Sequence, residues 1–394
     1  MVFPVLEYLV FPILILVGFR LDSSKIQEPM SAVQAPHTDP DSLAYQVIEA
    51  INRNEFGSAD RIIDSRLEIG SDSLQWLFLR GMRFYADVSG ADNHFKKETL
   101  TELTRDLSKV GEMADARLET DPTDSASLFY GGGAYGYLSI SYATDGSYFK
   151  ALSTAKKGFR YHEKLISLHP DCYDAYLGPG LINLMVSASP WVLKPILFLL
   201  GLSGTEGKAH EYLTLAYEKG TRTRLEAGRY LAQLYERQQK YDKSSEIYLA
   251  LTQTHPMKID LRAEAFSALF AQKRYGEIIR LANDAMSSFE SSRFSFTSRD
   301  SGRMASIFSS CSLAHKLSGD TLAATRVWND YLSRDAYQGL NTWRAYYSLT
   351  DLYLLQKDTT LAIQSLERLI ASAAPDKAKR WARNRIDELR STRR

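Results

Sequence analysis

The stretch from Asp171 to Leu202 reads DCYDAYLGPGLINLMVSASPWVLKPILFLLGL and decides the fold, because it is the most apolar part of the chain and lies between two helix patterns. The triplet His169-Pro170-Asp171 at its start ends one helix and begins the next, since proline cannot continue a helix and aspartate accepts hydrogen bonds from a helix N-terminus. Pro190, Lys194 and Pro195 then interrupt the apolar run, so it is too broken for a straight membrane-spanning helix. We interpret the stretch as an apolar insertion between two helices.

Two interpretations of the insertion, residues 189–202, stay open. In the first it is a structural plug whose large side chains fold back and are buried; the prolines and the flexible stem of Lys194 favour this arrangement. In the second the same side chains stay exposed and contact lipid or an apolar ligand. The candidate apolar contact residues are Trp191, Ile196, Phe198 and Leu199. After the insertion, Ser203-Gly204-Thr205-Glu206 matches the S-x-x-E capping pattern and predicts the start of the next helix.

The residues around the insertion carry a resemblance to a known family. They are Tyr148-Phe149-Lys150-Ala151-Leu152, Lys157-Gly158, Tyr161, Glu163-Lys164, His169-Pro170-Asp171, Tyr173 to Gly178, Gly180-Leu181, Pro190, Lys194, Phe198-Leu199 and Gly201. This pattern resembles a class of bacterial tetratricopeptide-repeat proteins, and it is distantly similar to the fungal inclusion-body clearance protein and its animal relatives. The match covers about Gly133 to Leu234, roughly a quarter of the chain. The resemblance implies a scaffold that binds proteins and has no catalytic residues to transfer.

Outward from this region, amphipathic helix patterns follow one another from Asp39-Pro40 to the C-terminus, with no strand-like alternation. The predicted pairs are Ser42–Asn52 with Glu55–Ile69, Ser73–Val88 with Lys97–Glu119, Ser125–Tyr142 with Tyr148–Leu168, Asp171–Ser187 with Glu206–Lys219, Arg222–Gln239 with Tyr241–Gln253, Lys258–Gln272 with Tyr275–Phe289, Asp300–Leu317 with Thr321–Leu332, and Thr342–Leu355 with Thr359–Ala371. A last helix is expected from about Asp376 to Leu389.

Two of these pairs have the residue spacing of a tetratricopeptide unit, in which small side chains let two antiparallel helices approach closely. The better one contains Leu231, Ala232, Tyr235, Ser244, Tyr248 and Pro256, and the second contains Tyr346, Leu349, Tyr353, Ala362 and Leu366. One pair cannot bury its own apolar face, so the pairs must stack. The predicted fold is therefore an all-α, tetratricopeptide-type solenoid over residues 40–374, a right-handed superhelix of about eight helix pairs with its concave side lined by the first helix of each pair.

A candidate peptide-binding groove lies on the first helix of the better repeat. Its charged side is opposite the packing stripe of Ala227, Leu231, Leu234 and Tyr235. The groove residues are Arg229, Gln233 and Arg237, with Arg222 and Arg224 just before them. Arginines in this arrangement bind acidic side chains or a peptide carboxylate. The alternative is a solvated face paired with Glu226 and Glu236.

The motifs of catalysis and cofactor binding are not supported by their context. Gly131 to Gly136 satisfies G-x-G-x-x-G, but no strand precedes it, and close helix packing requires the same small residues. His162-Glu163 begins like a zinc-protease helix, yet the next histidine, His169, is too far along for an adjacent ligand. Cys172 and Cys311 have no metal-ligand spacing. We expect no cofactor, no metal and no enzymatic activity; an enzyme whose site is assembled from distant residues is a weaker alternative.

The two termini differ in character. Val2 to Phe19 is largely apolar with Glu7 as its single charged residue, so residues 1–21 are predicted to be an export signal or membrane anchor, followed by a flexible tether over 22–39. A basic n-region and a clear cleavage site are missing. Residues 375–394 form a basic segment with an apolar side at Ala378, Trp381, Ala382, Ile386 and Leu389, which favours a capping helix over contact with anionic lipid or nucleic acid.

Composition narrows the functional class. The formal net charge of +1 over 394 residues excludes a general nucleic-acid binder. We therefore expect a non-enzymatic protein-interaction scaffold at a bacterial-type cell envelope, in the periplasm or at the inner membrane, with a protein or peptide in its groove and possible membrane contact. The location becomes cytoplasmic if the N-terminal segment is not a signal. The alternative is a membrane-associated accessory component that binds lipid or an apolar ligand through the insertion.

Overall fold

A computed structural model describes residues 43–53, 55–70, 73–88, 97–192, 194–199, 201–256, 258–291, 298–334 and 342–391. The predicted N-terminal signal or anchor and the tether lie outside these residues. The regular elements within the described ranges are helices, which confirms the all-α prediction. The chain divides into two compact units, Met1–Ile247 and Tyr248–Arg394, and the division falls inside helix α12 (Tyr241–Thr254).

The helices begin and end within about two residues of the predicted positions, the usual uncertainty of helix ends, with one exception. The helix predicted from Asp171 begins at Leu177, after a 3₁₀ turn. The N-terminal unit contains α2 (Leu43–Asn52), α3 (Phe56–Glu68), α4 (Ser73–Val88), α5 (Lys97–Thr120), α6 (Ser125–Thr144), α7 (Tyr148–Leu168), the 3₁₀ turn η1 (Tyr173–Tyr176), α8 (Leu177–Ala188), α9 (Lys194–Leu199), α10 (Glu206–Glu218) and α11 (Arg224–Arg237). The C-terminal unit contains α13 (Ile259–Ala271), α14 (Tyr275–Ser291), α15 (Ser298–Leu317), α16 (Thr321–Ser333), α17 (Thr342–Leu355), α18 (Thr359–Ala371) and α19 (Asp376–Ser391).

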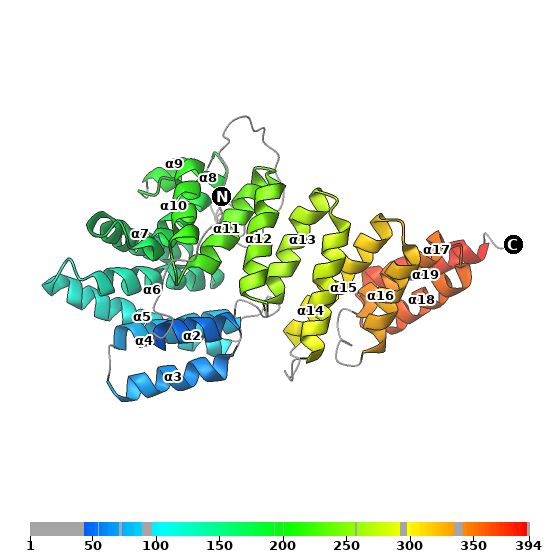
Figure 1. Cartoon of the computed structure of the whole chain (residues 1–394), viewed down its shortest axis with the longest axis horizontal. Helices are drawn as coiled ribbons and strands as arrows, with labels where there is room; N and C mark the ends of the chain where they lie inside the picture. Colours follow the sequence, from blue (N-terminus) through cyan, green and yellow to red (C-terminus); the bar gives the residue numbers. More distant parts are fainter. Residues whose placement is uncertain are drawn as a thin grey trace. The chain divides into compact units, whose positions relative to one another are not determined.

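The helices are stacked as consecutive pairs (Figure 1). In the N-terminal unit the first helices α2, α4, α6, α8 and α11 contact one another in turn and form one layer, while α3, α5, α7 and α10 each pack against their own partner. In the C-terminal unit α13 contacts α14 and α15, α15 contacts α16, α17 contacts α18, and α18 contacts α19. This is the helix-pair arrangement of a tetratricopeptide-type solenoid, with α9 inserted inside the pair α8 and α10.

One backbone turn recurs inside the pairs. The first helix ends with a residue of positive φ at Gln239 (58°), Lys273 (57°), Gly319 (91°) or Lys357 (62°). The next residue donates its N–H to a carbonyl five positions back, as in Lys240 to Tyr235 at 2.8 Å. This is the Schellman motif, which satisfies carbonyl groups that the helix end leaves free. Because the turn is so short, the second helix of each pair must run back along the first.

In two pairs a single aspartate ends the first helix and caps the second. Asp320 donates its N–H to the His315 carbonyl at 3.0 Å, and its carboxylate accepts from the N–H of Ala323 at 2.8 Å. Asp358 repeats this pattern between α17 and α18, where its carboxylate accepts from the N–H of Leu361 at 2.9 Å. An N-cap of this kind contributes about 1 kcal/mol.

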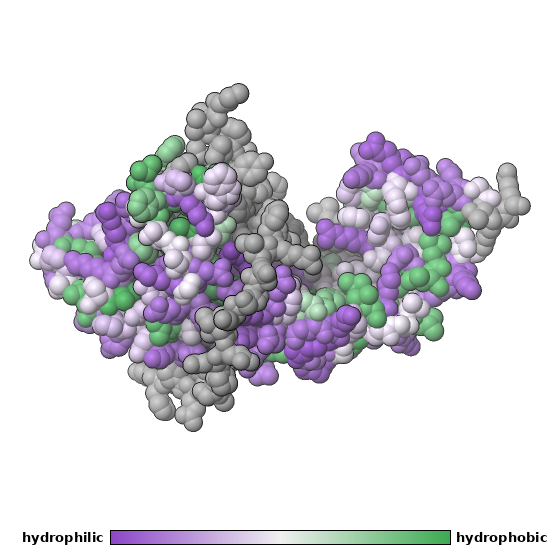
Figure 2. Space-filling view, turned by 90° about the horizontal axis from the view of Figure 1, so that it is seen from above, coloured by the Kyte–Doolittle hydropathy of each residue, from purple (hydrophilic) through white to green (hydrophobic). Residues whose placement is uncertain are grey.

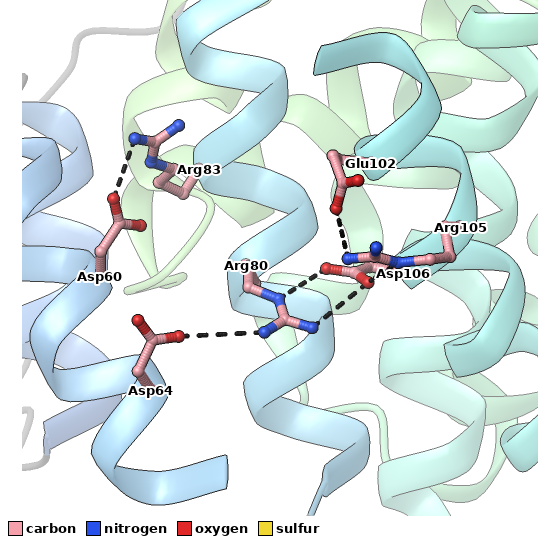
Figure 3. Close-up of polar contacts among 7 residues, drawn as sticks. All are labelled: Asp60, Asp64, Arg80, Arg83, Glu102, Arg105 and Asp106. Atoms are coloured by element: carbon pink, nitrogen blue, oxygen red, sulfur yellow. Dashed lines mark hydrogen bonds and ion pairs between the residues drawn. The ribbon is translucent and has the colours of Figure 1, made fainter. Parts of the chain in front are cut away.

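The core lies between the helices of each pair and between neighbouring pairs. Leu74, Leu103, Leu107 and Val110 are fully buried in the cluster formed by α4, α5 and α6. Polar contacts reinforce the same region, since Arg80 on α4 lies 2.6 Å from the carboxylate of Asp106 on α5 and 3.8 Å from Asp64 on α3 (Figure 3). The Asp106 side chain is only 2% exposed and also accepts from Arg105 at 3.1 Å. A buried carboxylate paired in this way fixes the three helices in one register.

Small residues on α6 serve close helix packing. A Cβ at Gly131 would lie 2.6 Å from the Ala114 side chain, and one at Gly133 would lie 2.7 Å from Phe78. These positions are inside a helix, so no loop is available to bring backbone amides against a pyrophosphate. The G-x-G-x-x-G match is therefore explained by packing.

Candidate interaction surfaces

Helix α11 buries the stripe that the sequence predicts, and its charged side faces α4 and α6. Ala227, Leu231 and Leu234 are at most 2% exposed. Arg229 on the other side is half-buried and lies 3.5 Å from the carboxylate of Glu226. Its charge is therefore balanced within the helix.

The side chains of α4 and α6 opposite this side of α11 are aromatic. The rings of Tyr85 on α4 and Tyr137 on α6 lie with their centroids 4.7 Å apart. Burial, and then the nearby Glu226, raise the pKa of Tyr137, while burial and Tyr230 raise that of Tyr85, so both phenols stay protonated. This surface offers neutral rings and hydroxyl groups beside one balanced ion pair.

The five predicted groove residues do not form one cluster. Arg222 donates to the Tyr130 hydroxyl at 2.8 Å and lies over the Phe129 ring, so it packs against α6. Arg224 donates to the carbonyls of Gly220 and Glu218 and closes the end of α10. Both arginines thus hold the fold together. Gln233 and Arg237 are half-buried, and a groove role for them and Arg229 stays a prediction.

The turn that carries Arg222 is fixed by one carboxylate. Asp174 in η1 accepts hydrogen bonds from the backbone N–H groups of Thr221, Arg222 and Thr223 at 2.8 to 2.9 Å. It also accepts from both threonine hydroxyls, at 3.1 Å and 2.9 Å. Asp174 therefore positions the start of α11 against the preceding pair.

The C-terminal unit contains a groove of about 630 Å³ between first helices. Its lining comes from α15, α17 and α19, with a contribution from Trp328 on α16: Ser309, Ser312, Leu313, Lys316, Trp328, Tyr347, Ser348, Thr350, Asp351, Leu352, Leu354, Trp381, Asn384, Arg385 and Glu388. The residues of α15 and α19 repeat at the i, i+3, i+4 and i+7 spacing of one helix face. The groove thus follows the first helices of successive repeats, which is where the sequence predicts the concave side.

Two aromatic side chains in the lining of this groove are in contact with each other. The rings of Tyr347 and Trp381 are in contact, with centroids 4.6 Å apart, yet the residues stay 46% and 38% exposed. A second, more apolar hollow of about 350 Å³ lies on their other side, beside Trp343 and Pro375. The pair therefore contributes to both hollows.

The charges of the groove are paired across or along its walls. Lys316 on α15 forms an ion pair with Asp351 on α17. Arg385 lies 2.6 Å from Glu388 on α19. The lining of the groove therefore combines aromatic and aliphatic side chains with hydroxyl groups and paired charges.

Trp381 differs from its predicted place. The sequence assigns it to the docking side of the last helix, and there Ala382 and Ile386 are indeed buried, at 0% and 6% exposure. Trp381 precedes Ala382 by one position, which turns it about 100° around the helix, away from the core and into the groove. An aromatic residue adjacent to a buried stripe, with Asn384, Arg385 and Glu388 on its own face, is the signal that could have located this groove.

A further Schellman motif, at the end of α9, holds the insertion against the N-terminal unit. Leu202 donates its N–H to Leu197 at 2.8 Å, Gly201 donates to Phe198 at 2.8 Å, and Gly201 has a φ of 70°. The motif brings the side chains of Leu197 and Leu202 together, and each is 1% exposed in a cluster with Val186. Among the side chains of α9 that the structure describes, Leu197 is the buried one.

The expectation that the large side chains of the insertion form a buried plug is wrong. Trp191 is 80% exposed, Phe198 is 72% exposed and Leu199 is 84% exposed. Successive residues of a helix are rotated by about 100° around its axis. With Leu197 pointing inward, the side chains of the next two residues, Phe198 and Leu199, therefore point outward. Ile196 belongs to α9, but its side chain lies outside what the structure describes.

The chain re-enters the repeat at α10, which begins at Glu206 as the sequence predicts and has Thr205 as its N-cap. Thr205 caps α10 by accepting from the N–H of Lys208 at 3.2 Å. Its own N–H donates at 3.1 Å to the buried amide of Asn183 on α8. A Cβ at Gly204 would lie 2.8 Å from the Asn183 backbone, so the two strands of chain touch at this point.

The described ranges contain no candidate metal site. No set of three or more His, Cys, Asp or Glu side chains there is suited to a metal ion. Burial raises the pKa of the Cys311 thiol to about 11, so it is not a reactive thiolate at neutral pH. None of the described helices combines the length and apolar character needed to cross a bilayer.

Comparisons with known proteins bear on the fold alone. No family model matches the sequence, and no curated protein matches it. Matching solved structures include yeast Tom70, at 12% identity over 90% of this chain and 83% of that chain with a TM-score of 0.36. A tetratricopeptide repeat protein from Parabacteroides merdae matches at 11% identity over 81% and 98%, with a TM-score of 0.36.

Human IFIT1, in a dimer with m7Gppp-AAAA, matches at 14% identity over 88% of this chain and 71% of that chain, with a TM-score of 0.37. These low identities and TM-scores say nothing about a partner or a ligand of this protein. The recurring turns and the order of helix pairs carry the assignment. The chain has the fold of a tetratricopeptide-type helix-pair protein.

Proposed function

We propose that this protein is a non-enzymatic interaction scaffold that binds a segment of another protein in the groove of α15, α17 and α19. The observation that carries this proposal is the contacting pair of Tyr347 and Trp381, which is half-exposed in the lining of a groove of about 630 Å³. Tryptophan and tyrosine dominate the energetics of protein interfaces because they bury a large apolar area and keep a polar tip.

The groove favours a peptide with a large apolar anchor and little net charge. Leu313, which is 43% exposed, adds an aliphatic side chain to the lining that the aromatic pair belongs to. The ion pairs Lys316–Asp351 and Arg385–Glu388 leave no uncompensated charge in the lining. The near-neutral chain also favours protein over nucleic acid as the partner.

The test is quantitative capture of partners by crosslinking in the native cell, with the full-length chain as bait. Trp381→Ala combined with Tyr347→Ala should lower recovery of the specific partner at least about thirtyfold, the effect of losing about 2 kcal/mol at an interface centre. Leu322→Ala is the control, because Leu322 is 65% exposed on α16 and is not among the residues that line the groove.

Two results would contradict this assignment. Undiminished capture by the Trp381 and Tyr347 variant would remove the groove from the interface. Loss of capture in Arg229→Glu combined with Arg237→Glu, with the aromatic variant unaffected, would move the binding site to α11, as the sequence predicts. Unchanged circular dichroism would verify that each variant is folded.

We also propose that the scaffold works at a bacterial-type cell envelope. The apolar segment Val2 to Phe19 supports this location, as does the resemblance of the region around the insertion to bacterial tetratricopeptide-repeat proteins. Cell fractionation would test it, and recovery of the full-length protein wholly in the cytosol would rule it out.

A further inference from the structure

The outer side of the insertion is an apolar surface on a rigid support. Trp191, Val192, Phe198 and Leu199 are 80%, 52%, 72% and 84% exposed. Figure 2 views the molecule from the side that carries α9, which lies at the top of Figure 1. It shows hydrophobic residues, in green, on this side of the N-terminal unit. Side chains exposed to this degree protrude from the surface, whereas those of a peptide groove line a hollow.

The surface has little freedom to fold back onto the protein. The side chains of Leu197 and Leu202 are buried on Val186, and the hydrogen bond from Thr205 to Asn183 holds the end of the loop. Leu197 and Phe198 are consecutive in a helix, so burying Phe198 would require lifting Leu197 out of its site. The exposed state is therefore the state that the packing enforces.

The insertion itself carries only positive charge. From Ala175 to Thr205 the sequence contains no aspartate or glutamate, and its single charged residue is Lys194, which is exposed. Lys156 on α7 lies beside Gly201 at the end of the insertion.

Helix α7 adds a further exposed aromatic side chain and a further lysine next to the insertion. Leu152 packs against the cluster of Leu197 and Leu202. Phe149, one helical turn earlier on the same face, is 73% exposed and is followed by Lys150. Aromatic side chains therefore stand among lysines, with no acid in the insertion itself.

We propose that this surface, formed by Trp191, Val192, Phe198 and Leu199, inserts into the headgroup and upper acyl region of a bilayer that contains anionic lipid. Interfacial insertion requires large apolar side chains that protrude, a tryptophan near the headgroup level, and basic residues that reach anionic headgroups. The surface supplies all three. This contact is separate from the peptide groove of the C-terminal unit and does not depend on it.

The experiment uses the full-length protein and the fluorescence of Trp191. Emission of the wild type minus that of Trp191→Phe isolates this residue from the other tryptophans. The probes are vesicles of phosphatidylcholine alone or mixed with phosphatidylglycerol, each with and without brominated acyl chains, which quench only a tryptophan that enters the acyl region. We expect quenching of Trp191 by the brominated mixed vesicles and much weaker quenching without the anionic lipid.

A double variant provides the specificity control. Phe198→Ser with Leu199→Ser should lower the partition of Trp191 into mixed vesicles at least about tenfold, because two large apolar side chains lose their transfer to the apolar phase. Leu322→Ser is the matched variant, since Leu322 is 65% exposed on α16, and its partition should equal that of the wild type. Both variants replace exposed side chains, so the melting temperature should not change.

The readout separates this contact from attachment by the N-terminal segment. Vesicles that bind the protein while Trp191 is not quenched would assign attachment elsewhere and overturn the proposal. Equal quenching with and without phosphatidylglycerol would remove the role of the lysines. A blue shift of Trp191 that grows with protein concentration in the absence of vesicles would instead assign the surface to a second copy of the chain, and would also overturn the proposal.

Discussion

A single buried imidazole locks three helices at the centre of the N-terminal unit. His162 on α7 lies between two glycines, and a Cβ at Gly132 or at Gly178 would come within 2.4 Å of its ring. Its Nε2 lies 3.0 Å from the carbonyl oxygen of Phe129, so the neutral ring donates its hydrogen there. The sequence presents His162 as half of a metal motif, but its surroundings make it a packing residue.

Burial lowers the pKa of His162, and the Phe129 carbonyl opposes this effect. Folding therefore disfavours the protonated ring, and the unfolded chain binds more protons. The contribution to stability is complete above the unfolded pKa, near 6.5, and is lost as the pH falls below that value. Urea unfolding should show a free energy that decreases from about pH 7 to about pH 5.

The variant His162→Gln tests which residue causes this slope. It should lower stability at every pH but flatten the dependence between pH 7 and pH 5. Burial also lowers the pKa of His210 and His315, so part of the slope should persist. An unchanged slope in the variant would show that the pKa of His162 is the same in the folded and the unfolded chain.

At the scale of elements, the recurring turn explains why different sequences give the same helix pair. The same positive-φ position is occupied by Gly319 in one pair and by a lysine, Lys273 or Lys357, in others. A residue with a Cβ pays about 1 kcal/mol for this conformation. The turn is therefore determined by the packing of the two helices more than by the residue in it.

A matched pair of substitutions measures this cost. Lys357→Gly should raise the free energy of unfolding by up to about 1 kcal/mol, because it removes the strain, partly offset by the flexibility of glycine in the unfolded chain. Gly319→Ala should lower it by a similar amount. The thermal midpoints, measured side by side, should move in opposite directions. Shifts of the same sign would mean that the two turns differ in more than their φ angles.

The sequence predicts the helices well because their apolar residues repeat at helical spacing and their turns contain recognisable breakers. It fails where the outcome depends on which side of a short segment meets the core. The pattern of α9 contains almost only apolar residues, so periodicity cannot tell that Leu197 turns inward while Phe198 and Leu199 turn outward. The aromatic groove was missed for a related reason, since Tyr347 and Trp381 meet only after distant helices stack.

At the scale of the whole molecule, α19 serves both stability and binding. Ala382 and Ile386 close the end of the stack on Leu366 and Leu369, while Trp381 on the same helix lines the groove. In a repeat protein each pair is stabilised mainly by its neighbours, so the last helix protects the pair before it. Damage to this contact should open the groove without unfolding remote repeats.

Ile386→Ala tests this coupling by hydrogen exchange. The lost packing should cost about 2 to 4 kcal/mol locally and raise exchange in α17, α18 and α19. Exchange in α4 to α7 should stay as in the wild type, since those helices belong to the other compact unit. Uniformly faster exchange throughout the chain would instead indicate a single cooperative unit.

The contacts that join the two ends of the insertion affect how such chains can diverge. The chain leaves α8 and re-enters α10 at points tied together by Asn183, Gly204 and Thr205. The entropic cost of closing a loop rises only with the logarithm of its length, so a longer insertion between the same two fixed points lowers the stability of the fold little more. Segments of other lengths and chemistries could therefore be grafted at this position. They would give related chains different cellular locations without changing the packing of the other helix pairs.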